Sequence, residues 1–427
     1  MIVLLLALLV PLAASAQENP PVLRAHSRTV DVQDGDRLLK GIWACDPRLE
    51  LDTYAARRSD LKRSIRFISD LDSISFDVEP GRSYDFIVLL DGKDACRTRI
   101  STLMQTCKRS DAIPAGPVTI PITISHGKLH LQGRINESEM LDLIFDTGAD
   151  MSVVYPSGKR KGAELQLDGR VSNGGTGGMT LRQQGRDNRL EVAGLQWEHE
   201  PILYVEKQSD AADGIVGYPA FEQKVVEIDY DRMVMVVHDA LPPSAAEFSK
   251  VPMTLAGSLT AVEAVLVHGA ATDAGAFVLD TAGSGTLMVN PAFAAAAGFH
   301  AALTKLGTST SRGVGSGSVE SEVLLLPELR LAGFTLHDVP IHVELSSEHG
   351  QSPPGGLLCM EVLARFNTLL DYSRYEAYFK PNASFDAPFE TRSWGRIAYV
   401  LAGVALVCLG SIAWWARMAA TRRRRPR

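Results

Sequence analysis

Two stretches of the chain carry an aspartate at the end of an apolar run: LIFDTGAD at residues 143–150 and FVLDTAGS at residues 277–284. Each run has the length and composition of a buried β-strand, and each aspartate opens a turn that begins with Asp-Thr. An ionisable side chain in such a place is costly unless it is paired. Because the pattern occurs twice, Asp146 and Asp280 are the first candidates for a joint functional site.

Two further pairs of segments repeat in the same order after these aspartates. VVEIDYDRMVMVVHD at 225–239 and NTLLDYSRYEAYFKP at 367–381 each read as a strand, a turn and a second strand, which is a β-hairpin signature. Upstream of them, DGIVGYPAF at 213–221 corresponds to GGLLCMEVL at 355–363. This conserved order indicates an internal duplication, and it predicts a mostly β region built from two tandem units.

The two units are expected at residues 116–245 and 246–383, and each contains a glycine-rich stretch. These stretches are NGGTGGMTLRQ at 173–183 and SRGVGSGSVESEVLLL at 311–326. Such a density of glycine indicates a hairpin tip or a close approach of two backbones. A dinucleotide-binding loop is the weaker interpretation, because no helical pattern follows. The glycines concerned are Gly174, Gly175, Gly177, Gly178, Gly313, Gly315 and Gly317.

Together these motifs resemble the pepsin-type aspartic proteases, and in detail a bacterial single-chain protein with two retropepsin-like lobes, over roughly 265 residues. The resemblance implies a bilobal pepsin-like unit in which Asp146 and Asp280 form a catalytic dyad. Two carboxyls in close contact cannot both ionise, so they share one proton. The ionised one then acts as general base on a water, and the protonated one polarises the carbonyl of a peptide bond.

The resemblance also implies supporting roles around the dyad. Thr147 and Thr281 are expected to brace the two turns against each other, with Gly148 and Ala282 as their neighbours in the turns. The glycine-rich hairpins are expected to close as flaps over an extended peptide. Six residues are expected to pack behind the turns: Ile215, Val216, Gly217, Leu357, Leu358 and Cys359.

The second unit departs from the family pattern at two positions. Ala282 and Cys359 stand where glycine is expected, and a positive φ at Ala282 would cost on the order of 1 kcal/mol. An alternative function is therefore a non-catalytic peptide-binding or scaffold protein with a degenerate second lobe. The residues after the turns, Ala149 and Gly283, carry no hydroxyl to stabilise an ionised aspartate, which predicts a less acidic pH optimum than that of pepsin-like enzymes with Ser or Thr there.

Both ends of the chain are apolar. Residues 1–16 read as a secretory signal peptide that ends in Ala-Ser-Ala, with an uncleaved anchor as the alternative. Residues 397–416 are long enough to cross a bilayer as a helix, after a linker at 384–396, and residues 417–427 form a basic tail that is expected in the cytoplasm. We therefore expect a bacterial inner-membrane protein with a periplasmic catalytic region. A sorting signal that is removed after export is the alternative for the C-terminal segment.

Residues 17–115 predict a small β-rich accessory domain, with a charged helical stretch at 54–67. In an exported protein two of Cys45, Cys96 and Cys107 could oxidise, and the sequence does not say which two.

The charge and the motifs limit the partners. The net charge is −7, and because the tail holds six arginines and no acid, the rest of the chain carries −13. This acidity argues against nucleic acid, and the sequence predicts no metal or cofactor. We expect a peptide or protein substrate, a lipid bilayer around the C-terminal helix, and a monomer in which the two units pair within the chain. Pairing of the first units of two chains around Asp146 is the alternative.

Overall fold

The computed structural model describes residues 20–389 except 36, 49–50, 56–62, 80–81, 103–106, 111–112, 114, 176–177, 208–211, 257, 313–317 and 346–354. The chain divides into two compact units between Met104 and Gln105. The predicted signal peptide, apolar C-terminal segment and basic tail lie outside the described residues. Within the described residues no helix is long and apolar enough to cross a membrane.

The first unit consists of two four-stranded sheets, with strand orders β1-β7-β8-β4 and β3-β2-β5-β6. Their inward side chains, among them Phe67 and Phe86, form one core. The predicted helical stretch at 54–67 is wrong where it is described, because burial alternates along β5 with a period of two. The strands are β1 Val22–Ala25, β2 Thr29–Asp34, β3 Arg37–Ala44, β4 Asp52–Ala55, β5 Arg63–Ile68, β6 Ser73–Val78, β7 Ser83–Leu90 and β8 Asp94–Ser101.

The second unit begins earlier than residue 116, because β9 (Cys107–Arg109) pairs with β17 of this unit. Its first sheet has nine strands, with β9 beside β17 and the order β11-β12-β13-β18-β14-β17-β16-β15. The strands of this sheet are β11 Thr123–Ser125, β12 Lys128–Ile135, β13 Leu141–Asp146, β14 Ser152–Val154, β15 Gly169–Gly175, β16 Gly178–Val192, β17 Leu195–Tyr204 and β18 Gly214–Gly217.

The second sheet of this unit has thirteen strands in the order β10-β20-β19-β29-β30-β21-β22-β23-β28-β24-β27-β26-β25. The prediction of a mostly β fold is confirmed. Its strands are β10 Val118–Pro121, β19 Val225–Asp229, β20 Val234–His238, β21 Ser249–Ala256, β22 Leu259–His268, β23 Ala271–Asp280, β24 Leu287–Val289, β25 Thr304–Arg312, β26 Ser318–Leu331, β27 Phe334–Glu344, β28 Gly356–Cys359, β29 Phe366–Asp371 and β30 Glu376–Pro381.

The two sheets contain the same pairing pattern twice. The order β12-β13-β18-β14-β17-β16-β15 corresponds strand for strand to β22-β23-β28-β24-β27-β26-β25. The parallel pairs also correspond: β13 with β18 and β23 with β28, then β14 with β17 and β24 with β27. We call residues 116–245, which contain the first pattern, the first repeat, and residues 246–383, which contain the second pattern, the second repeat.

Short helices connect the strands of each repeat. A 3₁₀ turn follows β18 and a helical turn follows β28, so that the match between the repeats extends beyond the strands. The helices are α1 Pro156–Arg160, η1 Tyr218–Phe221, η2 Pro243–Glu247, α2 Pro291–Ala297, α3 Phe299–Ala302 and α4 Met360–Leu363.

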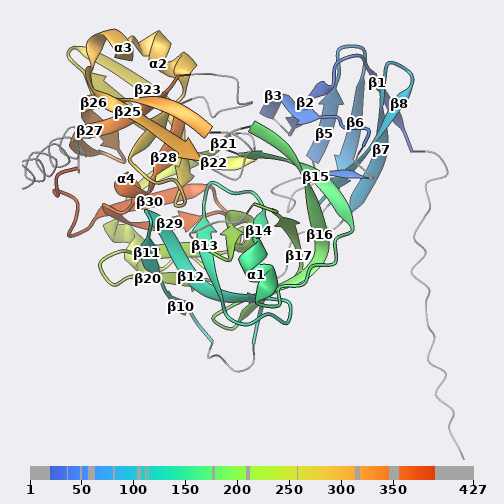
Figure 1. Ribbon diagram of the computed structural model, residues 1–427, viewed down its shortest axis with the longest axis horizontal. Coiled ribbons are helices and arrows are strands. Elements are labelled where there is room, and N and C mark those ends of the chain that lie inside the picture. Colours follow the sequence, from blue (N-terminus) through green and yellow to red (C-terminus); the bar gives the residue numbers. More distant parts are fainter. Residues whose placement is uncertain are drawn as a thin grey trace, which may run out of the picture. The chain divides into compact units, whose positions relative to one another are not determined.

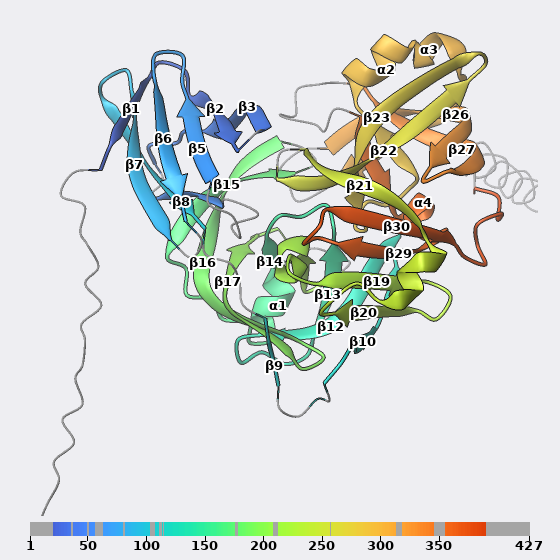
Figure 2. The ribbon, with the colours of Figure 1, turned by 180° about the vertical axis from the view of Figure 1, so that it is seen from behind.

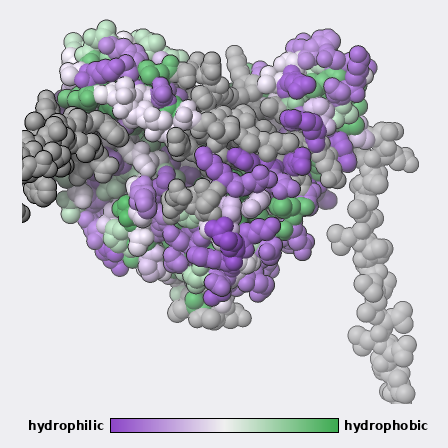
Figure 3. All heavy atoms as spheres, in the orientation of Figure 1, coloured by the Kyte–Doolittle hydropathy of each residue, from purple (hydrophilic) through white to green (hydrophobic). Residues whose placement is uncertain are grey.

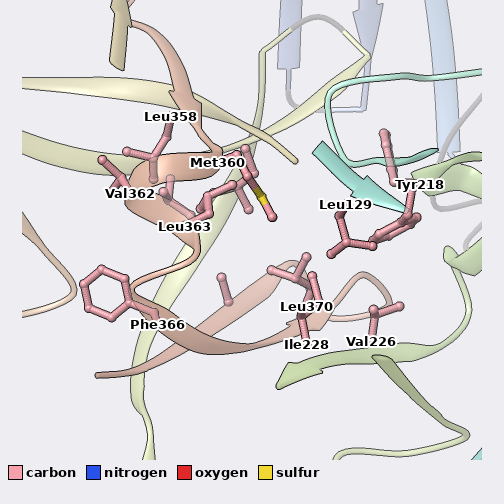
Figure 4. Close-up of a cluster of buried hydrophobic side chains, with 14 of the residues drawn as sticks. Leu129, Tyr218, Val226, Ile228, Leu358, Met360, Val362, Leu363, Phe366 and Leu370 are labelled. Carbon is pink, nitrogen blue, oxygen red and sulfur yellow. The ribbon is translucent and has the colours of Figure 1, made fainter. Parts of the chain in front are cut away.

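The two hairpins recognised in the sequence join the repeats. β19 pairs antiparallel with β29, so that Val226 lies opposite Leu370, and Figures 1 and 2 show the hairpin β29–β30 beside the hairpin β19–β20. A single apolar core runs beneath them. Figure 4 shows Leu129 and Ile228 of the first repeat in one cluster with Leu358 and Phe366 of the second. Separating the repeats would therefore expose core side chains of both.

The described surface is mixed in character. The face shown in Figure 3 is largely hydrophilic, with hydrophobic residues in small groups. The exposed large apolar side chains of the second unit come from separate loops and strands, which is ordinary for a folded protein. They are Ile124, Met140, Leu167, Leu306 and Leu345.

Candidate active site

Asp146 and Asp280 are the last residues of β13 and β23, which occupy equivalent positions in the two repeats. Each strand is held from one side by a parallel partner, and the register places Asp146 opposite Gly217 and Asp280 opposite Cys359. Phe145 and Leu279, the residues before the aspartates, are completely or almost completely buried. The apolar runs therefore fix the strands in the core, and the first turn beyond the core carries the acid.

Two threonines connect the turns after the aspartates. The amide of Thr147 donates to Thr281 Oγ1 at 3.1 Å, and the amide of Thr281 donates to Thr147 Oγ1 at 3.1 Å. Each hydroxyl in turn donates into the opposite strand, to Leu279 O at 2.7 Å and to Phe145 O at 2.6 Å. The arrangement is the brace that the family resemblance implied, and its reciprocity fixes the spacing of the two aspartates.

The carboxyl groups of Asp146 and Asp280 lie close enough to interact directly with each other. Gly148 lies against both: a Cβ on it would come within 3.1 Å of Asp280 Cγ and 3.2 Å of Asp146 Oδ1. Both aspartates remain partly exposed to solvent. The pair is thus close enough to hold one proton and open enough to hold a water.

The surroundings make the two carboxyls unequal. Burial and then the charge of Asp280 raise the pKa of Asp146 to about 8. Burial also raises the pKa of Asp280, but the Lys128 ammonium and the amides of Ala282 and Gly283 oppose that rise. Those amides donate to Asp280 Oδ1 at 2.9 and 2.6 Å, whereas Asp146 accepts only the Gly148 amide, at 2.8 Å, from its own turn. These contacts favour the negative charge on Asp280 and the shared proton on Asp146.

Ala282 fits its turn without strain. It is absent from the residues with positive φ, so the condition under which its Cβ would be costly does not arise. Its methyl group packs on a cluster of the first repeat that includes Tyr155 and Ile215. The replacement of glycine by alanine therefore adds a contact between the repeats and leaves the amide of residue 282 on Asp280.

Cys359, the other departure from the family pattern, is completely buried beside the turn. A Cβ on Gly283 would lie 2.8 Å from Cys359 Sγ and 2.7 Å from Asp280 Oδ2. In the first repeat a Cβ on Gly217 would meet the backbone of Met151 at 2.9 Å, so that position has no room for a side chain. In the second repeat, Cys359 replaces the glycine found at the equivalent position, Gly217, of the first repeat, and residue 283 beside it is a glycine, which leaves room for the Cys359 side chain.

The segments expected behind the turns are found there. Three are strongly buried hydrophobic residues of the strands beside β13 and β23, namely Ile215, Val216 and Leu358, while Leu357 is half-buried. Each strand leads into a side chain that contacts the Asp-Tyr hairpin of the other repeat. Tyr218 stacks on Tyr372 with ring centroids 5.0 Å apart, and Tyr230 donates its hydroxyl to Met360 Sδ at 3.8 Å.

The glycine-rich stretches lie on β-hairpins of equivalent position. Gly174 and Gly175 end β15 and Gly178 begins β16, with Gly175 paired to Gly178. In the second repeat the hairpin β25–β26 pairs as far as Arg312 and Ser318. The remaining predicted flap glycines, Gly177, Gly313, Gly315 and Gly317, lie outside the described residues.

Three polar residues near the turns escaped the sequence analysis. Glu200 is 2% exposed and accepts a hydrogen bond from Ser152 at 2.7 Å, and Ser152 in turn accepts the Gly217 amide at 3.3 Å. Lys128 donates its ammonium group to the carbonyl of Ala282 in the turn of the second repeat. None of these contacts has a local signal in the sequence, because the partners are far apart along the chain.

No family model matches the chain, and no curated protein matches its sequence. Among solved structures, the chain is similar to the aspartic proteinase from Irpex lacteus, with 14% identity and a TM-score of 0.44. The match covers 64% of this chain and 99% of the proteinase. At that TM-score and identity the likeness says nothing about activity.

Proposed function

We propose that the protein is an aspartic endopeptidase in which Asp146 and Asp280 activate one water between them. The observation that supports this proposal is the contact between the two carboxyls, which equivalent strands bring together and which the Thr147–Thr281 brace holds. A structural ion pair would join opposite charges, whereas two acids in contact are stable only when they share a proton. Such a pair contains a general base and a general acid at the same place.

The inequality of the carboxyls assigns their roles. The ionised Asp280 takes a proton from the water as the water oxygen attacks the carbonyl carbon of the substrate. Asp146, which holds the shared proton, donates it to the carbonyl oxygen as that atom gains negative charge. The tetrahedral intermediate then collapses: the C–N bond breaks, the proton taken up by Asp280 passes to the leaving nitrogen, and a hydroxyl group of the intermediate returns its proton to Asp146. The pair returns to a single shared proton, so the cycle needs no metal or cofactor.

An extended peptide is the substrate that this architecture accepts best. The hairpins β15–β16 and β25–β26 occupy equivalent positions in the two repeats. Hairpins of this kind can pair with a peptide through main-chain hydrogen bonds, which give affinity without demanding a particular sequence. In the proposed function both hairpins close over the peptide and exclude bulk water, while one water stays between the carboxyls.

The proposed location is the periplasmic side of a bacterial inner membrane. The support comes from the sequence alone: an apolar N-terminal segment that ends in small residues, and the uncharged stretch at 397–416 followed by six arginines. The protein would be a monomer with its C-terminus in the cytoplasm. Mass measurement of the mature chain tests whether either end is removed.

A peptide library assayed from about pH 3 to about pH 8 tests the activity. We expect the full-length protein to cleave, and Asp146→Asn and Asp280→Asn each to lose roughly a thousandfold or more in kcat/KM. Asp187→Asn, which changes an exposed aspartate paired with His199, serves as the control and keeps its activity. Full activity in Asp280→Asn would contradict the shared dyad and favour a symmetric Asp146 pair from two chains. Peptide binding without cleavage would favour the scaffold alternative.

A further inference from the structure

The tip of a hairpin in the first repeat lies along the turn that follows Asp280. This hairpin consists of β11 and β12. The amide of Leu129 donates to Thr281 O at 3.2 Å, and Ser284 Oγ donates to His126 O at 3.0 Å. Between these two contacts the Lys128 ammonium donates to the carbonyl of Ala282. The half-buried Lys128 is therefore held against the turn by contacts on both sides.

The equivalent hairpin of the second repeat contacts the other turn without a cation. Ser258, between β21 and β22, donates its hydroxyl to Asp150 Oδ2, and its carbonyl accepts the Tyr218 hydroxyl at 2.6 Å. The strand-initial residue that corresponds to Lys128 is Leu259. The duplication thus places each hairpin against the turn of the other repeat, and of the contacts described here only those with the Asp280 turn include a positive charge.

The charge acts on both carboxyls of the pair. Lys128 lowers the pKa of Asp280 and of Asp146 against the larger effect of burial. The other titratable groups around the pair oppose ionisation or stay neutral. The Cys359 thiol has a pKa raised by burial and by the charge of Asp280, and the phenols of Tyr155 and Tyr372 have pKa values raised by burial and then by the charge of Asp146.

The Lys128 ammonium is thus a cation that acts on both carboxyls of the pair, whereas Arg182 acts on the neighbouring Tyr155 phenol. The remaining stabilisation of negative charge comes from the backbone amides of Gly148, Ala282 and Gly283. Those amides belong to turns that the Thr147–Thr281 brace also holds, independently of Lys128. The charge of Lys128 can therefore be removed without removing the amide donors.

We propose that Lys128 is a positioning residue for the dyad: it holds the turn Thr281–Ser284 and keeps the Asp146–Asp280 pair in its singly protonated state at mildly acidic pH. This inference rests on the proposed function as far as activity is concerned. A doubly protonated pair has no general base, so the lysine extends the active range toward lower pH. Lys128 acts on the pair through its positive charge, whereas a residue that only fills space would not change the pH dependence of activity.

Two substitutions separate charge from contact. Lys128→Gln keeps an N–H donor near Ala282 O and removes the charge, and Lys128→Arg keeps the charge. We expect Lys128→Gln to move both limbs of the kcat/KM–pH profile toward higher pH, with a loss of roughly threefold to tenfold on the acid side. Lys128→Arg keeps the limbs of the wild type. The control is Lys250→Gln, which removes an exposed cation of β21 that pairs with Glu376 of β30. If Lys128→Gln does not fold, Lys128→Met replaces it.

A second readout does not depend on catalysis. Titration of ¹³C-labelled aspartate carboxyls by NMR, with Asp146→Asn and Asp280→Asn to assign the signals, reports the protonation of the pair directly. A midpoint that moves to higher pH in Lys128→Gln supports the inference even if the wild type cleaves no peptide, in which case only the proposed function fails. Unchanged titration together with a pH-independent loss of activity overturns the inference and leaves the enzyme in place.

Discussion

Glu200 offers a quantitative test of how the first repeat handles a buried acid. The side chain is 2% exposed, and Ser152 donates to its Oε1 at 2.7 Å. Its Oε2 has no hydrogen-bond partner within the described part of the chain. Burial raises the pKa of Glu200 from its ordinary value of 4.5 to about 7. Glutamine has the shape and the donor of the protonated acid, so Glu200→Gln fixes the neutral form at every pH.

The sign follows from proton binding. Between about pH 4.5 and about pH 7 the folded protein holds a proton on Glu200 that the unfolded chain has released. Stability therefore falls as pH rises through this window. At about 1.4 kcal/mol for each pH unit, the loss reaches about 3 kcal/mol above the window. Below the window wild type and Glu200→Gln differ only by the constant effect of the substitution.

Urea unfolding at a series of pH values measures the difference between the two proteins. The dyad carboxyls titrate in both proteins, so their contribution cancels when the free energies of unfolding are subtracted. We expect the free energy of unfolding of Glu200→Gln to increase relative to that of the wild type as pH rises. The increase should total about 3 kcal/mol between a pH below the window and a pH above it. Glu198→Gln, on the same strand and less buried, controls for the loss of one negative charge. A difference that stays constant with pH, or that changes in the opposite direction, would refute the reasoning.

Two further predictions concern close contacts between side chains. Gly283→Ser should destabilise the protein by about 1–3 kcal/mol, because its Cβ would meet Cys359 Sγ at 2.8 Å and Asp280 Oδ2 at 2.7 Å. Adding Cys359→Gly removes one of these two contacts and should recover part of the lost stability. Denaturant unfolding of the single and double variants measures the coupling. In the first unit, the thiols of Cys45 and Cys96 are buried in the same core and interact with each other. Oxidation of the protein by a low-molecular-weight disulfide should therefore join them with the loss of two hydrogen atoms, which peptide mapping detects, and two free thiols after such treatment would contradict the prediction.

The sequence predicts the dyad turns well because their signals are local. A run such as LIF before Asp146 defines a buried strand by itself, and the matching run before Asp280 doubles the information. The Asp-Tyr hairpins were predicted for the same reason, although the pairing of β19 with β29 and the stacking of Tyr218 on Tyr372 were not. Contacts of that kind depend on how the two repeats pack against each other, and this packing cannot be read from any single segment of the sequence.

The burial of Glu200 could not be predicted from the sequence for a different reason. Strand alternation along β17 buries Leu195 and Trp197 and would point residue 199 inward and residue 200 outward. His199 instead has φ of 58°, in a strand whose pairing with β16 is irregular, and the burial pattern shifts by one residue from there. Such a bulge turns the following side chains to the other face of the sheet. A sequence pattern that assumes regular alternation therefore assigns Glu200 to solvent, whereas the backbone places it in the core.

The sequence duplication also could not predict that the two aspartates would have unequal electrostatic surroundings. Equivalent strands, turns and threonines suggest equivalent aspartates, and the backbone meets that expectation. The electrostatics do not, because Lys128 has Leu259 as its counterpart and because Asp280 accepts two amides of its turn where Asp146 accepts one. A shared proton needs such an imbalance to have a fixed position, and in the proposed mechanism that position gives one carboxyl the role of base and the other the role of acid. The duplication therefore brings the two acids together, and under the proposed function the differences between its copies give them separate roles.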